Sequence, residues 1–413
     1  MNRCRKLLLI GATTGYQTRV FGDAAERLGL ELQLATDRCH VLDDPWGDHA
    51  LALRFEDPEG AARTIAAESQ VDGIVAVGDR PAYIAALAAA LIGIPYNSPD
   101  SVLACRNKFL ARERFRSAEL PVPEFFRVPL DEGPHRAALA TPYPCVLKPL
   151  GLSASRGVIR ANNSEEFAAA FRRIAALLGD PDILHFNEEH HRFIQVEGFI
   201  EGREFALEGI LSGGRLRVLA LFDKPDPLDG PYFEETIYVT PSRASGETQR
   251  DIIHTTESAV RALGLTHGPV HAEMRVNARG VWMLEVAARP IGGLCARVLP
   301  GLEELILRNA AGEDVSAFPM PVDAAGVMMI PIPREGVYED VGGLDEARSA
   351  PGVEDVIITA KQGQKLMPLP EGNSYLGFIF ARGETPEAVE RALRASHERL
   401  RFEVATALPV VSG

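Results

Sequence analysis

The sequence predicts a multidomain protein in which an α/β lobe is followed by α+β lobes. The chain has 413 residues, which is too long for one ordinary hydrophobic core. Strand and helix patterns alternate over residues 5–100, as is typical of a parallel sheet covered by helices. Later strand patterns follow one another across tight turns, and a segment at about 320–413 combines strands with an amphipathic helix.

The composition and charge limit the class of protein. With 46% apolar and 24% charged residues, the chain is typical of globular domains. A formal net charge of −14 argues against a general nucleic-acid or anionic-membrane binder, because such surfaces need excess Lys and Arg. The cysteines are scattered without a CxxC pair, which predicts reduced thiols and neither a disulfide framework nor a zinc site. They are Cys4, Cys39, Cys105, Cys145 and Cys295.

Neither apolar stretch that resembles a targeting or membrane segment fits one. The start, "MNRCRKLLLIGATTGY", has basic residues before a short apolar run, but that run leads into a glycine turn and predicts a first strand. The longest apolar stretch, "YIAALAAALIGIPY" (83–96), falls short of the roughly 20 residues that a membrane helix needs. We therefore expect a cytoplasmic protein without membrane or nucleic-acid partners.

The first lobe is predicted element by element. "KLLLIGA", "LELQLAT" and "VDGIVAVGD" are expected strands. "RVFGDAAERLG" predicts a helix closed by Gly29, and "RPAYIAALAAALIG" a helix that ends at Gly93. Gly11 and Gly15 do not form GxGxxG, so a small α/β lobe is favoured over a dinucleotide site.

A second unit begins near residue 100. Ser101 can cap a helix that runs to about Ala118. "YPCVLKP" and "GVIRA" are expected strands on either side of a loop at 151–157, and "NNSEEFAAAFRRIAALLGD" an amphipathic helix. "FIQVEGFIEGREFALEGILSGG" predicts a strand, a turn at 200–202 and a second strand that continues to "RLRVLALFDK". A polar, Pro-rich stretch (225–245) and the helix "GETQRDIIHTTESAVRALGL" come next.

The hairpin "VHAEMRVNARGVWMLEVAARP" carries two acidic residues. If Gly280 ends a three-residue loop in the left-handed conformation, Glu273 lies directly opposite Glu285. Paired strands are about 5 Å apart, so the two like charges destabilise the hairpin unless they are neutralised. A divalent cation such as Mg²⁺ resolves the conflict. An even loop would separate the two carboxylates, and two solvated glutamates are the alternative.

Three further segments suggest a nucleotide site. Lys148 ends an apolar strand, and the Gly151–Gly157 loop offers backbone N–H groups to phosphates, although it lacks GxxxxGK[ST]. Arg289, in "EVAARPIGG", has a guanidinium fork that suits oxyanions. In "VEGFIEGRE" the linker can present backbone groups to adenine, and Glu204 can accept hydrogen bonds from ribose. A solvated lysine and a surface arginine are the alternatives.

The segment "HFNEEHH" (185–191) crowds His and Glu together. Its spacing matches no zinc pattern, and it precedes the strand that leads into the linker. It is expected to be a solvated loop.

In order and spacing, these segments resemble the ATP-grasp superfamily over nearly the whole chain. The resemblance implies an ATP-grasp fold with an N-terminal Rossmann-like parallel α/β lobe and a small C-terminal α+β lobe. The implied divisions are 1–104, 105–315 and 316–413. "NKFLARERFRSAELPVPEF" and "CVLKPLGLSASRGV" are similar to the two lysine-bearing segments and the phosphate loop. The nucleotide contacts that they imply are Lys108, Lys148, Ser153 and Ser155.

The remaining site residues also follow from this resemblance. "QVEGFIEGREFALEGIL" is similar to the adenine linker and ribose carboxylate of the family. Its implied nucleotide contacts are Glu197, Gly198, Phe199, Ile200 and Glu204. "HAEMRV…MLEVAARP" is similar to the metal-binding strands, which makes Glu273 and Glu285 the implied ligands of Mg²⁺ or Mn²⁺. Many members have an asparagine where this chain has Ala287, so one or two ions are compatible with the pattern.

Within the superfamily, two segments resemble L-amino-acid ligases: "LFDKPDPLDGPYFEETIYVTPS" and "NSYLGFIFARGETPEAVERAL". This implies an ATP-dependent carboxylate–amine ligase that forms a dipeptide-like amide through an acyl phosphate, with Arg289 and Lys148 catalytic. Candidate contacts to the small-molecule substrates are Glu234 or Glu235, His271 and Arg297, each with a structural role as the alternative. Related ligases are often dimers, which leaves a homodimer open.

Two other functions remain in competition. One keeps the superfamily but acts on bicarbonate or a purine-pathway substrate, although the chain has no biotin-accepting lysine motif. The other is a nucleotide-binding regulatory protein that has lost catalysis. Retention of both lysines, both glutamates and Arg289 argues against the second, because a scaffold needs no charge-neutralising set.

Overall fold

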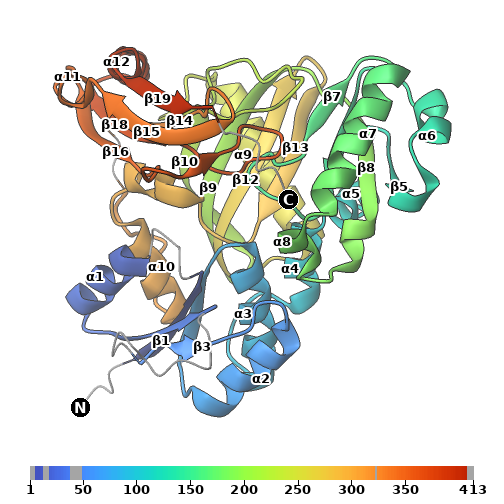
Figure 1. Cartoon of the computed structure of the whole chain (residues 1–413). Coiled ribbons are helices and arrows are strands. Elements are labelled where there is room, and N and C mark those ends of the chain that lie inside the picture. The colour runs from blue at the N-terminus through green and yellow to red at the C-terminus, as the bar shows by residue number, and fades with distance from the viewer. Residues whose placement is uncertain (1–4, 13–17, 38–48, 321–322, 407–413) are drawn as a thin grey trace, which may run out of the picture.

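The computed structural model describes residues 5–12, 18–37, 49–320 and 323–406, and arranges them in four β-sheets surrounded by helices (Figure 1). The N-terminal lobe (blue) lies at the bottom of the view, the segment around α7 (green) at the right, and the C-terminal segment (orange to red) at the upper left. Within the described residues, no helix combines the length and the apolar character that crossing a bilayer requires.

The N-terminal sheet is fully parallel, as the alternating pattern predicts. It has four strands in the order β3-β2-β1-β4. They are β1 (Lys6–Gly11), β2 (Glu31–Thr36), β3 (Leu51–Ala52) and β4 (Gly73–Val77). The helices of this lobe are α1 (Thr18–Leu28), α2 (Pro58–Glu68) and α3 (Asp79–Ile92). Strand β3 and helix α2 are additions to the predicted elements, and Gly15 lies outside the described residues.

Alternation along β1 explains why helices cover both faces of this sheet. Leu8 and Ile10 pack with α2 and α3, whereas Leu7 and Leu9 pack with α1 and α10 (Leu302–Ala310). Successive side chains of a strand point to opposite faces, so a strand with both sets apolar must be buried on both. The longest apolar stretch therefore forms a core helix of this lobe, α3.

The single helix expected from Ser101 to about Ala118 is wrong. The structure has two helices, α4 (Pro99–Arg106) and α5 (Lys108–Ser117), and Ser98 rather than Ser101 caps the first. Asn107 interrupts the helix with extended backbone angles, and its side chain accepts hydrogen bonds from the first N–H groups of α5. The break places Lys108 at the first position of a helix that points toward the cavity described below.

The second sheet is antiparallel, with the strand order β5-β8-β6-β7. Its strands are β5 (Phe125–Pro129), β6 (Cys145–Pro149), β7 (Ile159–Ala161) and β8 (Phe193–Gly198). Helix α7 (Ser164–Leu178) buries Phe167, Phe171 and Ile174 against it, because these residues repeat at helical spacing. The other helices here are α6 (His135–Ala140), α8 (Pro181–Leu184), η1 (Leu130–Glu132) and η2 (Glu189–Arg192).

The central sheet has eight strands in the order β13-β12-β9-β10-β11-β14-β18-β16. Its strands are β9 (Arg203–Ser212), β10 (Arg215–Asp223), β11 (Ile237–Thr240), β12 (Gly268–Asn277), β13 (Gly280–Ala287), β14 (Ala324–Ile330), β16 (Val353–Ile358) and β18 (Gly377–Gly383). Helix α9 (Gly246–Leu263) buries apolar residues against β13 and its neighbours, and η3 (Gly293–Val298) follows β13. Strand β11 lies inside the Pro-rich stretch, where no strand is predicted.

The C-terminal segment is divided between two sheets. β14, β18 and β16 extend the central sheet, and β11 pairs directly with β14. The remaining strands, β15 (Gly336–Gly342), β17 (Lys365–Leu366) and β19 (Arg401–Ala405), form a separate three-stranded sheet. Helices α11 (Leu344–Arg348) and α12 (Pro386–His397) pack here. A continuous sheet thus crosses the predicted boundary near residue 316, and that division stays a prediction.

Candidate active site

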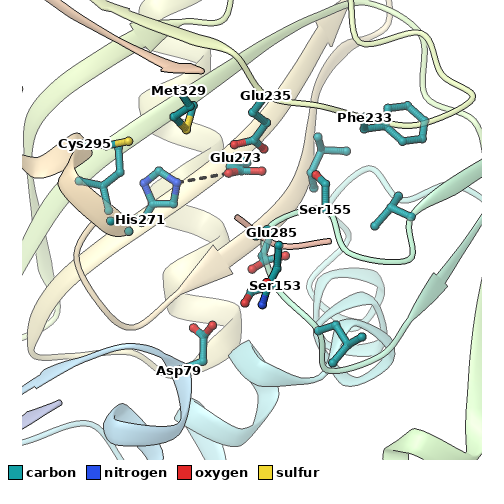
Figure 2. Close-up of a pocket in the computed structure, with 18 of the residues that line it drawn as sticks. Asp79, Ser153, Ser155, Phe233, Glu235, His271, Glu273, Glu285, Cys295 and Met329 are labelled. Atoms are coloured by element: carbon teal, nitrogen blue, oxygen red, sulfur yellow. Dashed lines mark hydrogen bonds and ion pairs between the residues drawn. The ribbon is translucent and has the colours of Figure 1, made fainter. Parts of the chain in front are cut away.

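One cavity of about 510 Å³ gathers most of the predicted site residues. It is lined by the second sheet, the 151–157 loop, the β12–β13 hairpin, the N-terminal end of α3 and the C-terminal segment. The predicted residues that line it are Lys108, Lys148, Ser153, Ser155, Glu197, Phe199, Ile200, Glu204, His271, Glu273, Glu285 and Arg289. Figure 2 draws 18 residues of this lining and labels ten of them, with Glu235 and Glu273 near the middle and Asp79 at the bottom.

The β12–β13 hairpin places the two predicted metal ligands opposite each other, but not by the expected route. Asn277 pairs with Gly280, so the loop has two residues and the predicted three-residue loop is wrong. Such an even loop alone would put Glu273 and Glu285 on opposite faces. The register shifts after Glu273, where Leu284 is an extra residue in β13, and this bulge restores the pairing of Glu273 with Glu285.

Glu273 belongs to a group of carboxylates around one buried ammonium group. The Nζ atom of Lys224 lies 2.8 Å from Glu204, 2.9 Å from Glu235 and 3.4 Å from Glu273. Tyr238 donates a hydrogen bond of 2.5 Å to Glu235. The ligand atoms of the three carboxylates lie within 4.8 Å of one another, a spacing at which they could also hold a metal ion.

The charges on Lys224 and the carboxylates around it determine which of these side chains are protonated. Burial alone would lower the pKa of Lys224, but the surrounding carboxylates raise it well above its ordinary value. Burial alone would raise the pKa of Glu273, but Lys224 and His271 lower it well below its usual range. Burial, together with the charge of Glu273, raises the pKa of Glu235. Lys224 therefore remains charged and supports an anionic Glu273 facing the cavity.

Glu285 is bound to a second lysine. The Nζ atom of Lys108 lies 3.2 Å from the Glu285 carboxylate and donates a hydrogen bond of 2.6 Å to the carbonyl oxygen of Leu152. Lys108 thus connects the hairpin to the 151–157 loop. The donor set fits a divalent cation such as Mg²⁺, because Glu273 and Glu285 offer only oxygen atoms, from adjacent strands, to the same cavity.

Lys148 lies in a buried ion-pair cluster at the wall of the cavity. Its ammonium group contacts the Glu197 carboxylate, which also receives hydrogen bonds from Arg112 at 3.0 and 3.2 Å. Burial alone would raise the pKa of Glu197, but the charges of Arg112 and Lys148 lower it to about 2. The side chain of Glu197 is therefore committed to charge neutralisation, so any contact from this residue to adenine must come from its backbone.

The linker after β8 offers one unpaired backbone donor to the cavity. The N–H groups of Gly198 and Phe199 donate to Glu124 and Pro144, and Gly198 does not line the cavity. The N–H group of Ile200, by contrast, has no hydrogen-bond acceptor among the described residues. A planar base with an acceptor at its edge fits here, since Phe199 lies beside the donor and stacks on Phe233 at 6.3 Å between ring centroids.

The 151–157 loop has a constrained backbone with several positive φ angles. Ala154 and Ser155 have φ values of 56° and 53°, and Gly157 has 74°. Such angles cost non-glycine residues about 1 kcal/mol or more each, so surrounding contacts must hold them. Two of these contacts come from the C-terminal segment, where Pro370 accepts a hydrogen bond from the N–H of Gly157 and Glu371 accepts one from Arg156.

Arg289 is held by a residue from the N-terminal lobe. Its Nε atom donates a hydrogen bond of 2.9 Å to Asp79, the first residue of α3, and both side chains line the cavity. Burial alone would raise the pKa of Asp79, but the Arg289 guanidinium lowers it. The alternative of a surface arginine is excluded, because only 12% of this side chain is exposed.

His271 forms hydrogen bonds with Glu208 at 3.1 Å and with Glu273 at 3.3 Å (Figure 2). Burial alone would lower its pKa, but these two carboxylates raise it to about 9. The ring lies opposite Ala287 on the neighbouring strand. His271 thus orients Glu273 next to the position where many ATP-grasp members have an asparagine.

Two predicted substrate contacts do not line the cavity. Glu234 is not among the residues that line the cavity, whereas its neighbour Glu235 is. Arg297 forms ion pairs of 3.2 Å with Asp355 and lies over the ring of Phe380, with 41% of its side chain exposed. The C-terminal segment thus engages Arg297 away from the cavity, which a short-range sequence pattern does not show.

The 185–191 segment is not the solvated loop that was expected. Glu188 accepts hydrogen bonds from Arg80 at 3.2 Å and Arg106 at 2.7 Å, and the Nε2 atom of His190 lies 2.9 Å away. His191 is buried. These groups lie close enough to share a metal ion, but two guanidinium groups already neutralise Glu188 and disfavour a cation. The cluster instead joins α3, α4 and η2 beside the cavity.

Glu188→Gln is expected to lower the free energy of unfolding by about 2 kcal/mol at pH 7, because it removes a partly buried carboxylate from two arginines. Burial alone would raise the pKa of Glu188, but His190, Arg106 and Arg80 lower it well below 4.5. A carboxyl group whose pKa is lower in the folded state stabilises the protein at pH values above its unfolded-state pKa, and this stabilisation is lost as the pH falls. Urea unfolding at pH 7 and pH 4 should therefore show a smaller difference at pH 4. Glu189→Gln, an exposed neighbour, should change neither value, and a pH-independent difference would contradict the role of Glu188.

Cys105, Cys145 and Cys295 are free and buried, as predicted for reduced thiols, and Cys4 and Cys39 lie outside the described residues. The sequence did not identify four site residues: Asp79, Arg112, Glu208 and Lys224. Glu208 left a signal, because it is a lone carboxylate within the apolar run "FALEGIL". Arg112 left none, because it lies in a helix rich in charged residues.

Two models of known protein families match separate parts of the chain. A family model of the ATP-grasp domain matches residues 141–298. A second model, of the L-amino acid ligase C-terminal domain 2, matches residues 328–405. The first match contains the 151–157 loop, the linker after β8 and both hairpin glutamates. The second covers β14 and β18, the C-terminal strands that help to line the cavity.

Individual relatives agree with these matches. The chain is 23% identical over 316 residues to an uncharacterized protein of Sinorhizobium fredii and 25% identical over 338 residues to an ATP-grasp enzyme of Aspergillus fumigatus. These alignments cover 75% and 70% of this chain, but only 64% and 56% of those relatives. The crystal structure of an L-amino acid ligase from Bacillus licheniformis has a TM-score of 0.79 and 26% identity, and the alignment covers 98% of this chain and 100% of that one.

Proposed function

We propose, from the premise that this chain belongs to the ATP-grasp superfamily and resembles its L-amino-acid ligases, that it is an ATP-dependent ligase joining a carboxylic acid to an amine. The acid is an amino acid or a related compound, and the product is a dipeptide-like amide. The observation that most supports the proposal is that Lys108, Lys148, Arg289 and the Glu273–Glu285 pair line one cavity.

The described residues suit ATP and a divalent cation. The Ile200 N–H and the ring of Phe199 would bind adenine, and Glu204 would accept hydrogen bonds from ribose. Lys108, Lys148 and the 151–157 loop would bind the phosphates. Glu273 and Glu285 would hold Mg²⁺ or Mn²⁺, which supplies neutralisation of the charge on the transferring phosphoryl group.

The reaction needs activation because a carboxylate is a poor acyl donor. In the proposed sequence, a carboxylate oxygen takes the γ-phosphoryl group and ADP leaves. The amine then attacks the acyl carbon, and phosphate and a proton are released. Arg289, held by Asp79, would stabilise the oxyanion of this second step, and Lys148 would stabilise the charge of the first. The 151–157 loop would exclude water from the acyl phosphate.

The competing functions have weaker support. Structures of purine-pathway synthetases, such as phosphoribosylglycinamide synthetase from Anaerococcus prevotii, share the fold at 16% identity and a TM-score of 0.68. That similarity concerns the fold alone. Lys224, Arg289 and the facing glutamates are buried charges, and each is costly because it must be compensated. A regulatory protein without catalysis would not need such a set.

The proposal is tested by measuring phosphate release from ATP and Mg²⁺ across pairs of amino acids, with mass spectrometry of the products. Release that requires two amino acids and yields a new amide mass is expected. If ATP binds but no pair releases phosphate, while bicarbonate or an aminoimidazole ribonucleotide does, the purine-pathway alternative replaces this proposal. Binding of ATP without release under any condition would favour the regulatory alternative.

Removal of the divalent cation with EDTA should abolish phosphate release, and excess Mg²⁺ or Mn²⁺ should restore it. Glu285→Gln removes one of the two facing carboxylates, so the Mg²⁺ concentration for half-maximal rate should rise by at least about tenfold. Glu234→Gln, outside the cavity, is the matched control and should leave this concentration unchanged. An unchanged Mg²⁺ requirement in Glu285→Gln would remove Glu285 from the metal site.

A further inference from the structure

The cavity has two apolar ends and a charged middle. At one end, the Phe233 cluster consists of Val146, Val158, Phe199 and Phe233. At the other end, the Met329 subsite consists of Ile291, Cys295, Met329, Tyr375 and Phe378. Figure 2 shows Met329 and Cys295 on the side away from Phe233, with Glu235 and Glu273 between them in this view.

The two ends belong to separate hydrophobic cores. The side chains of the Met329 subsite pack with the core of β1, α1 and α10, whereas the Phe233 cluster packs above β6 and the linker. Each apolar patch therefore has its own structural support, and the carboxylates of Glu235 and Glu273 line the same cavity. A cavity of this kind suits two ligand parts that are apolar at opposite ends and charged where they meet.

The proposed function already assigns a ligand, adenine, to the Phe233 cluster. It adjoins the free N–H of Ile200, which on the proposed function binds adenine. The Met329 subsite, in contrast, adjoins the reacting groups: Ile291 follows Arg289 by two residues, and the subsite lines the same cavity as Arg289 and His271. An occupant of this subsite can therefore present a carboxylate near Arg289.

We infer that the Met329 subsite binds an apolar side chain of the amino acid that is activated as the acyl donor. This inference rests on the proposed ligase function and names its substrate class. Ile291, Cys295, Met329 and Phe378 are at most 5% exposed and provide no charged group. A charged side chain would lose its hydration there without a partner, whereas an aliphatic or thioether side chain gains by leaving water.

A neighbouring carboxylate explains why the donor is an amino acid rather than a plain acid. Glu235 lines the cavity, and its charge raises the pKa of both Cys295 and Tyr375, after the larger effect of their burial, so it lies close to the subsite. It already accepts from Tyr238 and Lys224, and its remaining lone pairs can accept from a substrate ammonium group. Ammonium, carboxylate and apolar side chain then have three separate partners.

Hydroxylamine tests the donor without knowledge of the natural amine, because it attacks any acyl phosphate and yields a hydroxamate. The full-length protein is incubated with ATP, Mg²⁺, hydroxylamine and one L-amino acid at a time. Methionine, leucine and phenylalanine are expected to give kcat/KM values at least about tenfold above those of aspartate, glutamate and lysine. Equal rates, or a preference for charged side chains, would overturn the subsite while leaving the ligase function intact. No hydroxamate from any amino acid, with ATP still bound, would overturn both.

A pair of adjacent methionines supplies a matched control. Met329 faces the cavity from β14, whereas Met328 faces the opposite side of the sheet. Met329→Ala should shift the preference toward bulkier donors, raising the phenylalanine-to-leucine ratio of kcat/KM by about tenfold, because it enlarges the subsite. Met328→Ala should leave this ratio unchanged although it also removes a buried side chain. Equal shifts in both variants would overturn the assignment, and Met329→Leu provides a milder change if Met329→Ala does not fold.

Discussion

Arg289→Lys should lower kcat for amide formation by about 100-fold or more, with a smaller effect on the KM for ATP. The guanidinium donates to Asp79 through Nε and to the Pro290 carbonyl oxygen through one terminal nitrogen, and the side chain lines the cavity. A lysine ammonium keeps the positive charge but cannot hold the Asp79 contact and face an oxyanion with a fixed plane. The change therefore removes orientation and leaves the net charge unaltered.

The measurement is steady-state phosphate release with the best amino-acid pair, at saturating and limiting ATP. Arg297→Lys is the matched control, since Arg297 lies outside the cavity and should change kcat by about twofold at most. If both variants lost activity equally, the effect would come from the segment that carries them. If Arg289→Lys retained full kcat, Arg289 would have no part in either chemical step.

Lys224→Met should lower the free energy of unfolding by about 3–5 kcal/mol, because removal of one partner leaves buried charges uncompensated. Lys224 is 6% exposed and pairs with Glu235 at 2.9 Å, whereas Glu204 also pairs with Arg275 at 2.9 Å. Without it, protonation is the main way to remove the charge of Glu235, which raises the folded-state pKa of that carboxyl group. A group whose pKa is higher in the folded state favours folding at low pH, and this contribution is lost as the pH rises. The variant should therefore be relatively more stable at pH 5 than at pH 8.

Urea unfolding of Lys224→Met and wild type at pH 5 and pH 8 checks this expectation. Lys365→Met is the control, because Lys365 pairs with Glu335 on the surface at 3.4 Å and should contribute less than about 0.5 kcal/mol. A pH-independent loss would mean that Lys224 acts by packing of its aliphatic stem. No loss at all would mean that the carboxylates are neutralised by other groups.

Sequence patterns alone were sufficient for most elements of the fold. The alternation over residues 5–100 predicted the parallel sheet, and the resemblance to the ATP-grasp superfamily predicted which segments would meet at one cavity. Both predictions rest on short-range signals: a period of two or 3.6 residues, or a motif within a few turns of chain. These patterns predict the folded structure because they reflect which side chains of each segment become buried.

The hairpin shows where such reasoning was correct for the wrong reason. Glu273 and Glu285 do face each other, but through a two-residue loop and a bulge rather than a three-residue loop. Two departures from the expected register cancelled. A bulge depends on how the whole sheet twists and on the neighbouring strand β9, and neither is encoded in the spacing between the glutamates.

By itself, the sequence determined the order of the elements, the lysines and glutamates that face the cavity, and the resemblance to carboxylate–amine ligases. Only the tertiary structure decided how these groups are neutralised and oriented. Asp79 is 210 positions from Arg289, and Arg112 is 85 positions from Glu197. Local propensity decides which residues form a strand or helix, but the partner of a buried charge is decided by which distant segments pack together, since burial makes an unpaired charge costly wherever its partner lies in the chain.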